Sequence, residues 1–139
     1  MSNPTYVLDT DISSYFIKGR YRSIDRRIDS LAPAEFAISV MTRAELMFGL
    51  KKLPSEHVFH LMVRRFLGGV QILDWGQDAG DIYAGLRHQL KDQNTSIGEL
   101  DVMIAAHAIS LNAILVTNNV KHFGRLAPLL QIENWVSEA

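Results

Sequence analysis

Three acidic residues of this 139-residue sequence, Asp9, Glu45 and Asp101, have the types and positions expected of a shared chemical site. Asp9 directly follows the apolar run at 6–8, which predicts a buried strand with the carboxylate at its C-terminal end. Glu45 and Asp101 lie in segments with the apolar spacing of helices. Carboxylates that converge without cysteine are hard oxygen ligands, which suit Mg²⁺ or Mn²⁺ rather than zinc. An ion held in this way can support phosphodiester hydrolysis, because it activates water and neutralises the leaving group.

Asp101 is the acid that local structure explains least well. On a helix that starts at Gly98, positions 101, 105, 108 and 112 share one face, and positions 105 and 108 are alanines. Small side chains allow this face to approach a neighbouring element closely, which draws Asp101 toward the sheet. A buried carboxylate is costly unless it is paired or bound to a metal, and no Lys or Arg lies within a turn of it on this helix. We therefore expect Asp101 to belong to a site.

The other acids also have local interpretations. Asp9 could serve only as a turn residue. The segments Thr42–Glu45 and Ser96–Glu99 both fit the capping box, in which the glutamate reaches back to the amide that starts the helix. For Glu99 we prefer this interpretation, whereas for Asp9 and Glu45 it stands beside that of a metal site.

The five histidines form no ligand cluster in the sequence. His57 and His60 are three positions apart but match no metal motif, so we expect them at the surface. His107 lies on the apolar helix, and we expect it to be a hydrogen-bonded core residue.

Apolar strand-like runs alternate with helical segments along the chain. The expected strands are at 6–8, 36–40, 70–73, 113–116 and 130–132. The expected helices are at 12–18, 22–31, 42–52, 58–67, 79–92 and 98–111, with a polar loop at 93–95. This alternation predicts an α/β fold with a central, mostly parallel sheet of four or five strands flanked by helices. Such sheets place their sites beyond the carboxyl ends of the strands, where Asp9 and the segment Thr117–Asn119 both lie.

The composition is typical of one globular domain over residues 1–139, with 47% hydrophobic and 21% charged residues. It excludes a disordered tail, a collagen-like chain and a coiled coil. Lys and Arg number 14 against 15 Asp and Glu, so nucleic-acid binding would need a local basic patch. One candidate patch is the segment 18–27, unless its cations are only a solvated helix face paired with Asp25 and Asp29. Its cations are Lys18, Arg20, Arg22, Arg26 and Arg27.

The sequence also indicates where the protein acts. The absence of cysteine excludes disulfides, thiolate zinc sites and a cysteine nucleophile, and it fits a reducing cytoplasm. The N-terminus carries no signal-peptide pattern. The longest stretch without charged residues, 102–120, contains polar side chains and is typical of a buried helix and strand rather than a membrane span. We expect a soluble, cytoplasmic protein with no membrane partner.

Three groups of residues resemble the motifs of a known family. They are Val7–Asp11, Ser39–Leu46 with Gly49, and Asp101–Ala106 followed by Ile114–Asn119 and Phe123. They resemble the PIN-domain ribonucleases, specifically the VapC toxins of toxin–antitoxin pairs, and the closing Ile132–Trp135 is also similar to the end of those proteins. The resemblance implies a single PIN-like domain and a metal-dependent endoribonuclease. It also implies cleavage of single-stranded or loop RNA, often tRNA, that leaves 5′-phosphate and 3′-hydroxyl ends.

The resemblance implies roles for individual residues. Asp9, Glu45 and Asp101 would be the catalytic, metal-holding acids, and Asn119 would occupy a fourth metal position that is acidic in many relatives. Thr117 would support that corner of the site. The roles left open are those of Asp11 and Glu99: Asp11 is a further acid near the metal or the N-cap of the helix at 12–18, and either residue could compensate for the neutral Asn119. The cations expected to position the RNA backbone are Lys18, Arg20, Arg43 and Arg87.

The same resemblance implies partners. A small VapB-type antitoxin would block the acidic site, where an inserted arginine could pair with the carboxylates. Tyr15, Phe16 and the helix of Phe48 could supply the apolar surface for this partner. The family also suggests a homodimer.

Two alternative functions remain open at this point. A haloacid-dehalogenase-like phosphatase also has a strand that ends in Asp-x-Asp, as Asp9–Asp11 does, but it needs a later acidic pair that the sequence lacks. A catalytically silent module that only binds RNA or a partner would leave the three acids without a function.

Overall fold

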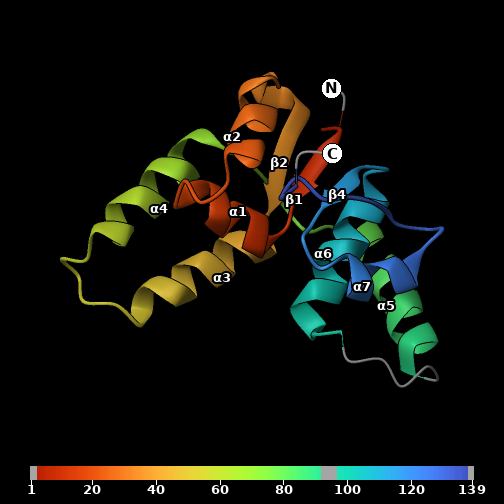
Figure 1. Cartoon of the computed structure of the whole chain (residues 1–139). Helices are drawn as coiled ribbons and strands as arrows, with labels where there is room; N and C mark the ends of the chain where they lie inside the picture. The colour runs from red at the N-terminus through yellow and green to blue at the C-terminus, as the bar shows by residue number, and fades with distance from the viewer. Residues whose placement is uncertain (1–2, 92–96, 138–139) are drawn as a thin grey trace.

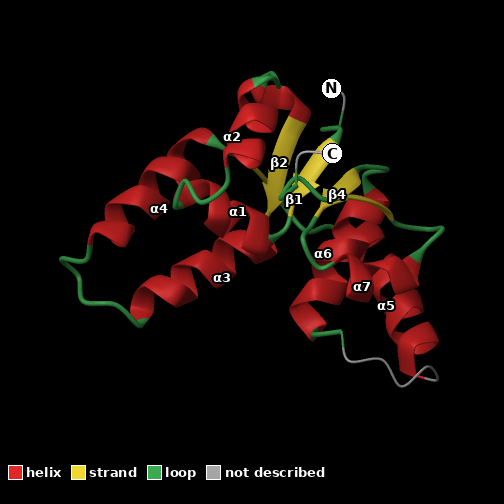
Figure 2. Cartoon of the chain, viewed as in Figure 1, coloured by secondary structure: helices red, strands yellow, loops and turns green. Residues whose placement is uncertain are grey.

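The computed structural model describes residues 3–91 and 97–137. Its centre is a five-stranded sheet in the order β3-β2-β1-β4-β5, and every neighbouring pair is parallel. Figure 2 shows β2, β1 and β4 side by side at the centre of this sheet. The strands are β1 (Tyr6–Leu8), β2 (Phe36–Ser39), β3 (Gln71–Leu73), β4 (Ile114–Val116) and β5 (Gln131–Glu133). The predicted α/β fold with a parallel sheet is therefore confirmed.

Helices cover both faces of this sheet. The long helices are α1 (Thr10–Ile17), α2 (Arg22–Asp29), α3 (Val40–Lys51), α4 (Val58–Gly69), α5 (Gln77–Lys91) and α6 (Glu99–Ser110). The short ones are η1 (Pro33–Glu35), α7 (Val120–Phe123) and η2 (Gly124–Leu126), which the sequence did not predict. Figure 1 shows α1, α2 and α4 on one side of the sheet and α5, α6 and α7 on the other.

The short strands are buried on both faces because their side chains alternate between two cores. Val7 and Leu115 point into one core with α5 and α6, whereas Leu8 and Val116 point into the other with α1 and α2. All four side chains are fully buried. Continuous burial of this kind explains why the strands are apolar throughout, and it fixes their register.

Helices α1, α3 and α5 each begin two residues earlier than the sequence predicts, and in α1 and α3 a residue at a strand end is the N-cap. Asp9, not Asp11, is the N-cap of α1, which starts at Thr10. Ser39 is the N-cap of α3, which starts at Val40 instead of Thr42. The predicted roles of Asp11 as a helix cap and of Thr42 as the start of a capping box are therefore wrong, because a strand-end residue caps each helix directly.

The remaining boundaries differ by only a few residues from those predicted. Helix α2 ends at Asp29, and the amide of its C-cap, Ser30, donates to the carbonyls of Arg26 and Arg27. The polar loop predicted at 93–95 lies outside the described residues. Within residues 3–91 and 97–137, no helix is long and apolar enough to cross a membrane.

Candidate functional site

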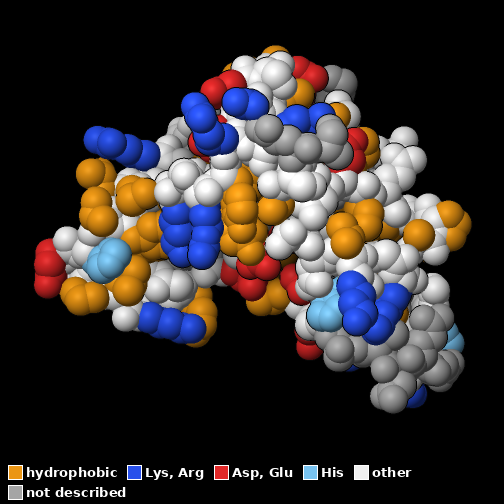
Figure 3. All heavy atoms as spheres, viewed as in Figure 1, with side chains coloured by type: hydrophobic (Ala, Val, Ile, Leu, Met, Phe, Trp, Pro, Cys, Tyr) orange, Lys and Arg blue, Asp and Glu red, His pale blue; other side chains and the backbone are white. Residues whose placement is uncertain are grey.

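The candidate site lies at the carboxyl edge of the sheet. Strand β1 is central, and the chain crosses to β2 on one side of it and to β4 on the other. Open parallel sheets bind ligands at such a reversal of strand order. Asp9 follows β1 directly, so its carboxylate stands at this point. Figure 3 shows acidic side chains gathered near the centre of the molecule, between the two groups of helices.

Asp9 is fixed by the start of helix α1. Its Oδ1 accepts a hydrogen bond from the amide of Ile12 at 2.8 Å, and the side chain is only 3% exposed. Burial raises the pKa of Asp9 to about 7, although hydrogen bonds from Thr117 and Ile12 favour the charged form. The negative charges of Asp11 and Asp101 contribute to this rise.

Glu45 is held from the neighbouring helix. It lies inside α3, where the hydroxyl of Thr10 donates a hydrogen bond of 2.5 Å to its Oε1. The Thr10 hydroxyl also lies 3.2 Å from that of Thr42, which is buried one turn before Glu45. Because α3 begins at Val40, Glu45 is not the closing residue of a capping box, and this local interpretation is wrong.

Asp101 approaches the same group of acids from α6. It lies in the first turn of that helix and is half-buried. Burial raises its pKa, and the charges of Glu45 and Asp11 raise it further, whereas His122 lowers it. The predicted alanine stripe is confirmed, since Ala105 and Ala108 are fully buried.

The segment after β4 supplies the polar corner of the site. Thr117 is fully buried, and its hydroxyl accepts a 2.9 Å hydrogen bond from the amide of Asn119. The half-buried side chain of Asn119 is 2.9 Å from Nδ1 of His122. The hydrogen bond between Thr117 and Asp9 therefore links this corner to the end of β1.

Glu99 is directed toward helix α5 rather than toward a helix cap. Its carboxylate accepts a hydrogen bond from the hydroxyl of Tyr83 and forms an ion pair of 3.1 Å with Arg87. Gly98 is the N-cap of α6, so the predicted capping role of Glu99 is wrong; its proposed partner Ser96 lies outside the described residues. The Tyr83 hydrogen bond raises the pKa of the Tyr83 phenol.

The other predicted residues are spread around this edge. Asp11 is exposed in the first turn of α1, and its charge acts on both Asp9 and Asp101. Arg43 is exposed on α3. Lys18 lies over the ring of Phe59 and Arg20 over that of Tyr15, at 5.3 and 5.8 Å from the ring centroids.

The sequence interpretation missed three residues that touch or influence the acids: Thr10, Thr42 and His122. Thr10 stands beside Asp9 in the sequence, and Thr42 precedes Glu45 by one helical turn, so each threonine belongs to the same sequence motif as an acid of the site. His122 follows Asn119 by three positions on the short helix α7, which the sequence did not predict.

The donor set fits a hard divalent cation in its chemistry. It consists of carboxylate and amide oxygens, and the buried Asp9 carboxylate would ionise more easily beside a cation. Among the described residues, no three His, Asp or Glu side chains stand close enough together to form a complete metal site. The acids are nevertheless near enough for the charge of Asp101 to raise the pKa of Asp9 and for that of Glu45 to raise the pKa of Asp101.

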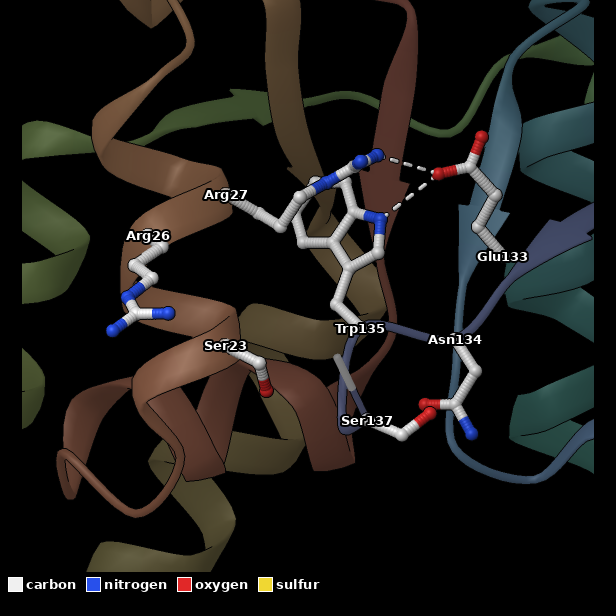
Figure 4. A pocket seen from close by; sticks show the side chains of 7 residues that line it. All are labelled: Ser23, Arg26, Arg27, Glu133, Asn134, Trp135 and Ser137. Carbon is white, nitrogen blue, oxygen red and sulfur yellow. Dashed lines mark hydrogen bonds and ion pairs between the residues drawn. The ribbon is translucent and has the colours of Figure 1, made fainter. Parts of the chain in front are cut away.

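A separate cavity of about 470 Å³ lies between α2 and the C-terminal segment. Figure 4 shows Arg27 over the ring of Trp135, with Glu133 accepting hydrogen bonds from both. The Arg27–Glu133 ion pair is 2.7 Å long. This contact ties α2 to the end of β5, so Arg27 pairs across the fold rather than with Asp25 or Asp29 on its own helix.

Comparison with known proteins places this chain in a family. A family model described as the PIN domain matches residues 6–128. Ribonuclease VapC2 of Rickettsia felis is 37% identical over 131 residues, which are 94% of this chain and 97% of that protein. The tRNA(fMet)-specific endonuclease VapC of Salmonella typhimurium is 32% identical over 130 residues, with 94% of this chain and 97% of that protein covered.

Solved structures agree with these relatives. A chain in the crystal structure of DNA-bound VapBC from Salmonella typhimurium has a TM-score of 0.86 and 31% identity, covering 97% of this chain and 99% of that one. A chain of VapBC2 from Rickettsia felis, bound to a DNA fragment from its promoter, has a TM-score of 0.84 and 36% identity over 94% and 98% of the two chains. These matches favour the nuclease over the haloacid-dehalogenase alternative. The chain belongs to the PIN-domain family and, within it, to the VapC ribonucleases.

Proposed function

We propose that this chain is a divalent-metal-dependent endoribonuclease in which Asp9, Glu45 and Asp101 hold the metal and Asn119 is a fourth ligand. The observation that carries this proposal is the buried carboxylate of Asp9, whose pKa is raised to about 7, mainly by burial and also by the charges of Asp11 and Asp101. An acid placed in this way is destabilising in its charged form unless a cation shares the site. Nucleases of the PIN family generally depend on divalent metal, and the oxygen donors here suit Mg²⁺ or Mn²⁺.

The residues around the acids prepare them for this role. The bound ion supplies an activated water and neutralises the charge that develops on the leaving oxygen. Asp9 is held by the amide of Ile12 and by Thr117, so its carboxylate keeps one orientation. Thr10 orients Glu45 through one carboxylate oxygen and leaves the other available. Outer hydrogen bonds of this kind orient metal ligands and tune their affinity.

The proposed substrate is RNA. The Salmonella relative is named as a tRNA(fMet)-specific endonuclease, and we infer that this chain cleaves tRNA or another RNA with single-stranded or looped segments. Arg43, Lys18 and Arg20 are exposed and can contact the phosphate backbone. Arg87 is also exposed, and it forms an ion pair with Glu99.

We further propose that a VapB-type antitoxin inhibits the enzyme, since the similar structures are of VapBC complexes. Phe48 is 63% exposed on α3, next to the acid-bearing part of that helix, and Tyr15 and Phe16 are half-buried on α1. An antitoxin that covers these side chains would lie beside Glu45 and could insert a cation among the acids. A homodimer, a single domain over 1–139 and a cytoplasmic location complete the proposal.

The test is RNA cleavage by the purified protein. We expect cleavage with Mg²⁺ or Mn²⁺, loss of cleavage in EDTA, and loss of cleavage in Asp9→Asn. The matched control is Asp29→Asn, which removes an exposed acid on α2 and should remain active. Cleavage in excess EDTA by a preparation free of contaminating nucleases would refute metal dependence. A correctly folded wild-type protein that never cleaves RNA would favour the catalytically silent binding module.

A further inference from the structure

A buried histidine joins two of the elements that carry the acids. His107 on α6 is 2% exposed, and its Nδ1 lies 2.8 Å from the hydroxyl oxygen of Ser39. Ser39 is the last residue of β2 and the N-cap of α3, and the same oxygen accepts a 3.1 Å hydrogen bond from the amide of Met41. His107 also bonds to the backbone of Asp74, directly after β3. One ring therefore connects α6, the start of α3 and the end of β3, as a hydrogen-bonded core histidine.

This group is not a nucleophilic triad, although it contains serine, histidine and aspartate. Ser39 is fully buried and its oxygen already caps α3, so no substrate reaches it. Burial lowers the pKa of His107, which favours the neutral ring. In the tautomer with its proton on Nε2, the ring accepts from Ser39 at Nδ1 and keeps a donor for the backbone of Asp74.

Glu45 and Asp101 are equally far, along their helices, from the His107–Ser39 contact. Glu45 lies six positions after Ser39 on α3, and Asp101 lies six positions before His107 on α6. At 1.5 Å per residue, each acid stands about 9 Å along its helix from the contact. The helices α3 and α6 pack against each other, and the charge of Glu45 acts on Asp101 across the gap between them.

The His107–Ser39 contact is therefore the point that fixes α3 and α6 relative to each other. If one helix tilts by about 10° about this contact, its acid, about 9 Å away, moves by about 1.5 Å, which is enough to disturb a metal site. We propose that His107 is a positioning residue that, through Ser39, sets the separation between Glu45 and Asp101. The inference rests on the proposed function, because it takes these acids as metal ligands.

Two substitutions separate the contacts of the ring. His107→Asn places an oxygen near the position of Nδ1 and retains an acceptor for Ser39, but it loses the contact with Asp74. His107→Gln reaches toward the position of Nε2 and retains the Asp74 contact, but it loses Ser39. Both replace the ring by a smaller polar group, so both should lower the melting temperature by similar amounts.

The measurement is Mn²⁺ binding by the full-length, RNA-free protein, followed by electron paramagnetic resonance. We expect His107→Gln to raise the Kd for Mn²⁺ about tenfold, because the separation between Glu45 and Asp101 changes, and His107→Asn to stay within about twofold of wild type. Ser39→Gly removes the hydroxyl while keeping an acceptable N-cap, and it should weaken binding as His107→Gln does. In the double variant, His107→Gln should add less than about twofold to the effect of Ser39→Gly, because both remove one contact.

Three results would overturn the inference. Unchanged Mn²⁺ affinity in His107→Gln and Ser39→Gly would show that the contact does not position the acids. Equal weakening in His107→Asn and His107→Gln would make the ring a packing group only. If Asp101→Asn binds Mn²⁺ as tightly as wild type does, the proposed metal site itself is wrong, and the inference falls with it. If His107→Gln does not fold, the Mn²⁺ affinity of Ser39→Gly alone tests the inference.

Discussion

The hydroxyl of Thr10 donates a hydrogen bond of 2.5 Å to the carboxylate of Glu45, 35 positions later in the chain. This bond joins the start of α1, where Asp9 is the N-cap, to the middle of α3. Through Thr10, the residue after Asp9, the backbone that carries the first acid is therefore tied to the side chain of Glu45. The glutamate side chain is long and flexible, and this hydrogen bond holds its carboxylate in one orientation.

Thr10→Val should separate this orienting role from packing, because valine keeps the shape of threonine and lacks the hydroxyl. We expect the rate of RNA cleavage to fall about tenfold to a hundredfold, with a smaller effect on the Km for RNA. Thr10→Ser keeps the hydroxyl and should stay within about threefold of wild type. Equal rates for the valine and serine variants would show that the hydrogen bond does not support catalysis.

The repulsion among the acids predicts a stability effect that needs no RNA. Asp101→Asn removes one charge from the group and leaves the buried Ala105 and Ala108 unchanged. In EDTA it should raise the melting temperature, by an amount worth on the order of 1 kcal/mol. Wild type should then gain more than the variant on addition of Mn²⁺, because the ion stabilises only the folded state that binds it.

Differential scanning calorimetry with and without Mn²⁺ measures both effects: the change in melting temperature on substitution in EDTA, and the rise in melting temperature on addition of Mn²⁺. A variant that melts below wild type in EDTA, with an equal response to Mn²⁺, would make Asp101 a structural hydrogen-bonding residue instead of a metal ligand.

The raised pKa of Asp9 predicts how stability depends on pH. Its ordinary value of 3.8 applies to the unfolded chain, and about 7 applies to the folded one, so the folded state binds the proton more tightly. The stabilising contribution is complete below about pH 4 and is lost as the pH rises through about 7. A difference of this size corresponds to about 4 kcal/mol. In EDTA, the contribution of Asp9 should therefore make wild type less stable as the pH increases from 5 to 8.

Asp9→Asn removes this titration and should flatten that part of the profile. Urea unfolding at several pH values measures it, with Asp29→Asn as the control that keeps the wild-type slope. Identical slopes for wild type and Asp9→Asn would contradict the assignment of this titration to Asp9.

Much of the fold and part of the site follow from local sequence patterns. The runs at 6–8 and 113–116 are apolar on both faces, as is expected of a strand that helices cover on both sides. Both runs form interior strands of the observed sheet. Asp9 follows from its place after such a strand. Asp101 follows from the alanines that share its face of the helix.

The roles of other residues depend on contacts between distant segments, which local patterns do not contain. Asp11 and Thr42 have residue types that fit the start of a helix, but Asp9 and Ser39 accept from the free amides instead. Glu99 fits a capping box in sequence, yet Tyr83 and Arg87 on α5 hold it. The Thr10–Glu45 and Ser39–His107 contacts arise only when α1, α3 and α6 pack together.

Arg43 is expected to contribute to RNA binding through its charge. It is exposed on α3, two positions before Glu45. Arg43→Gln should weaken binding of uncleaved RNA in EDTA and reduce the slope of log Kd against log salt by about 1. Arg64→Gln, an exposed change on α4, should leave the slope unchanged. Fluorescence polarisation at several salt concentrations measures both, and equal slopes for wild type and Arg43→Gln would remove Arg43 from the RNA-binding surface.

The central claim is that Asp9, Glu45 and Asp101 hold a divalent metal at the carboxyl edge of the sheet. The most direct measurement is anomalous X-ray diffraction from crystals of the protein grown with Mn²⁺. The account predicts an anomalous peak at about 2.1–2.3 Å from carboxylate oxygens of Asp9 and Asp101, with Glu45 in the same coordination sphere or bound through water. The peak should be absent from crystals of Asp101→Asn. An anomalous peak elsewhere, or none beside Asp9 at a Mn²⁺ concentration that supports RNA cleavage, would contradict the claim.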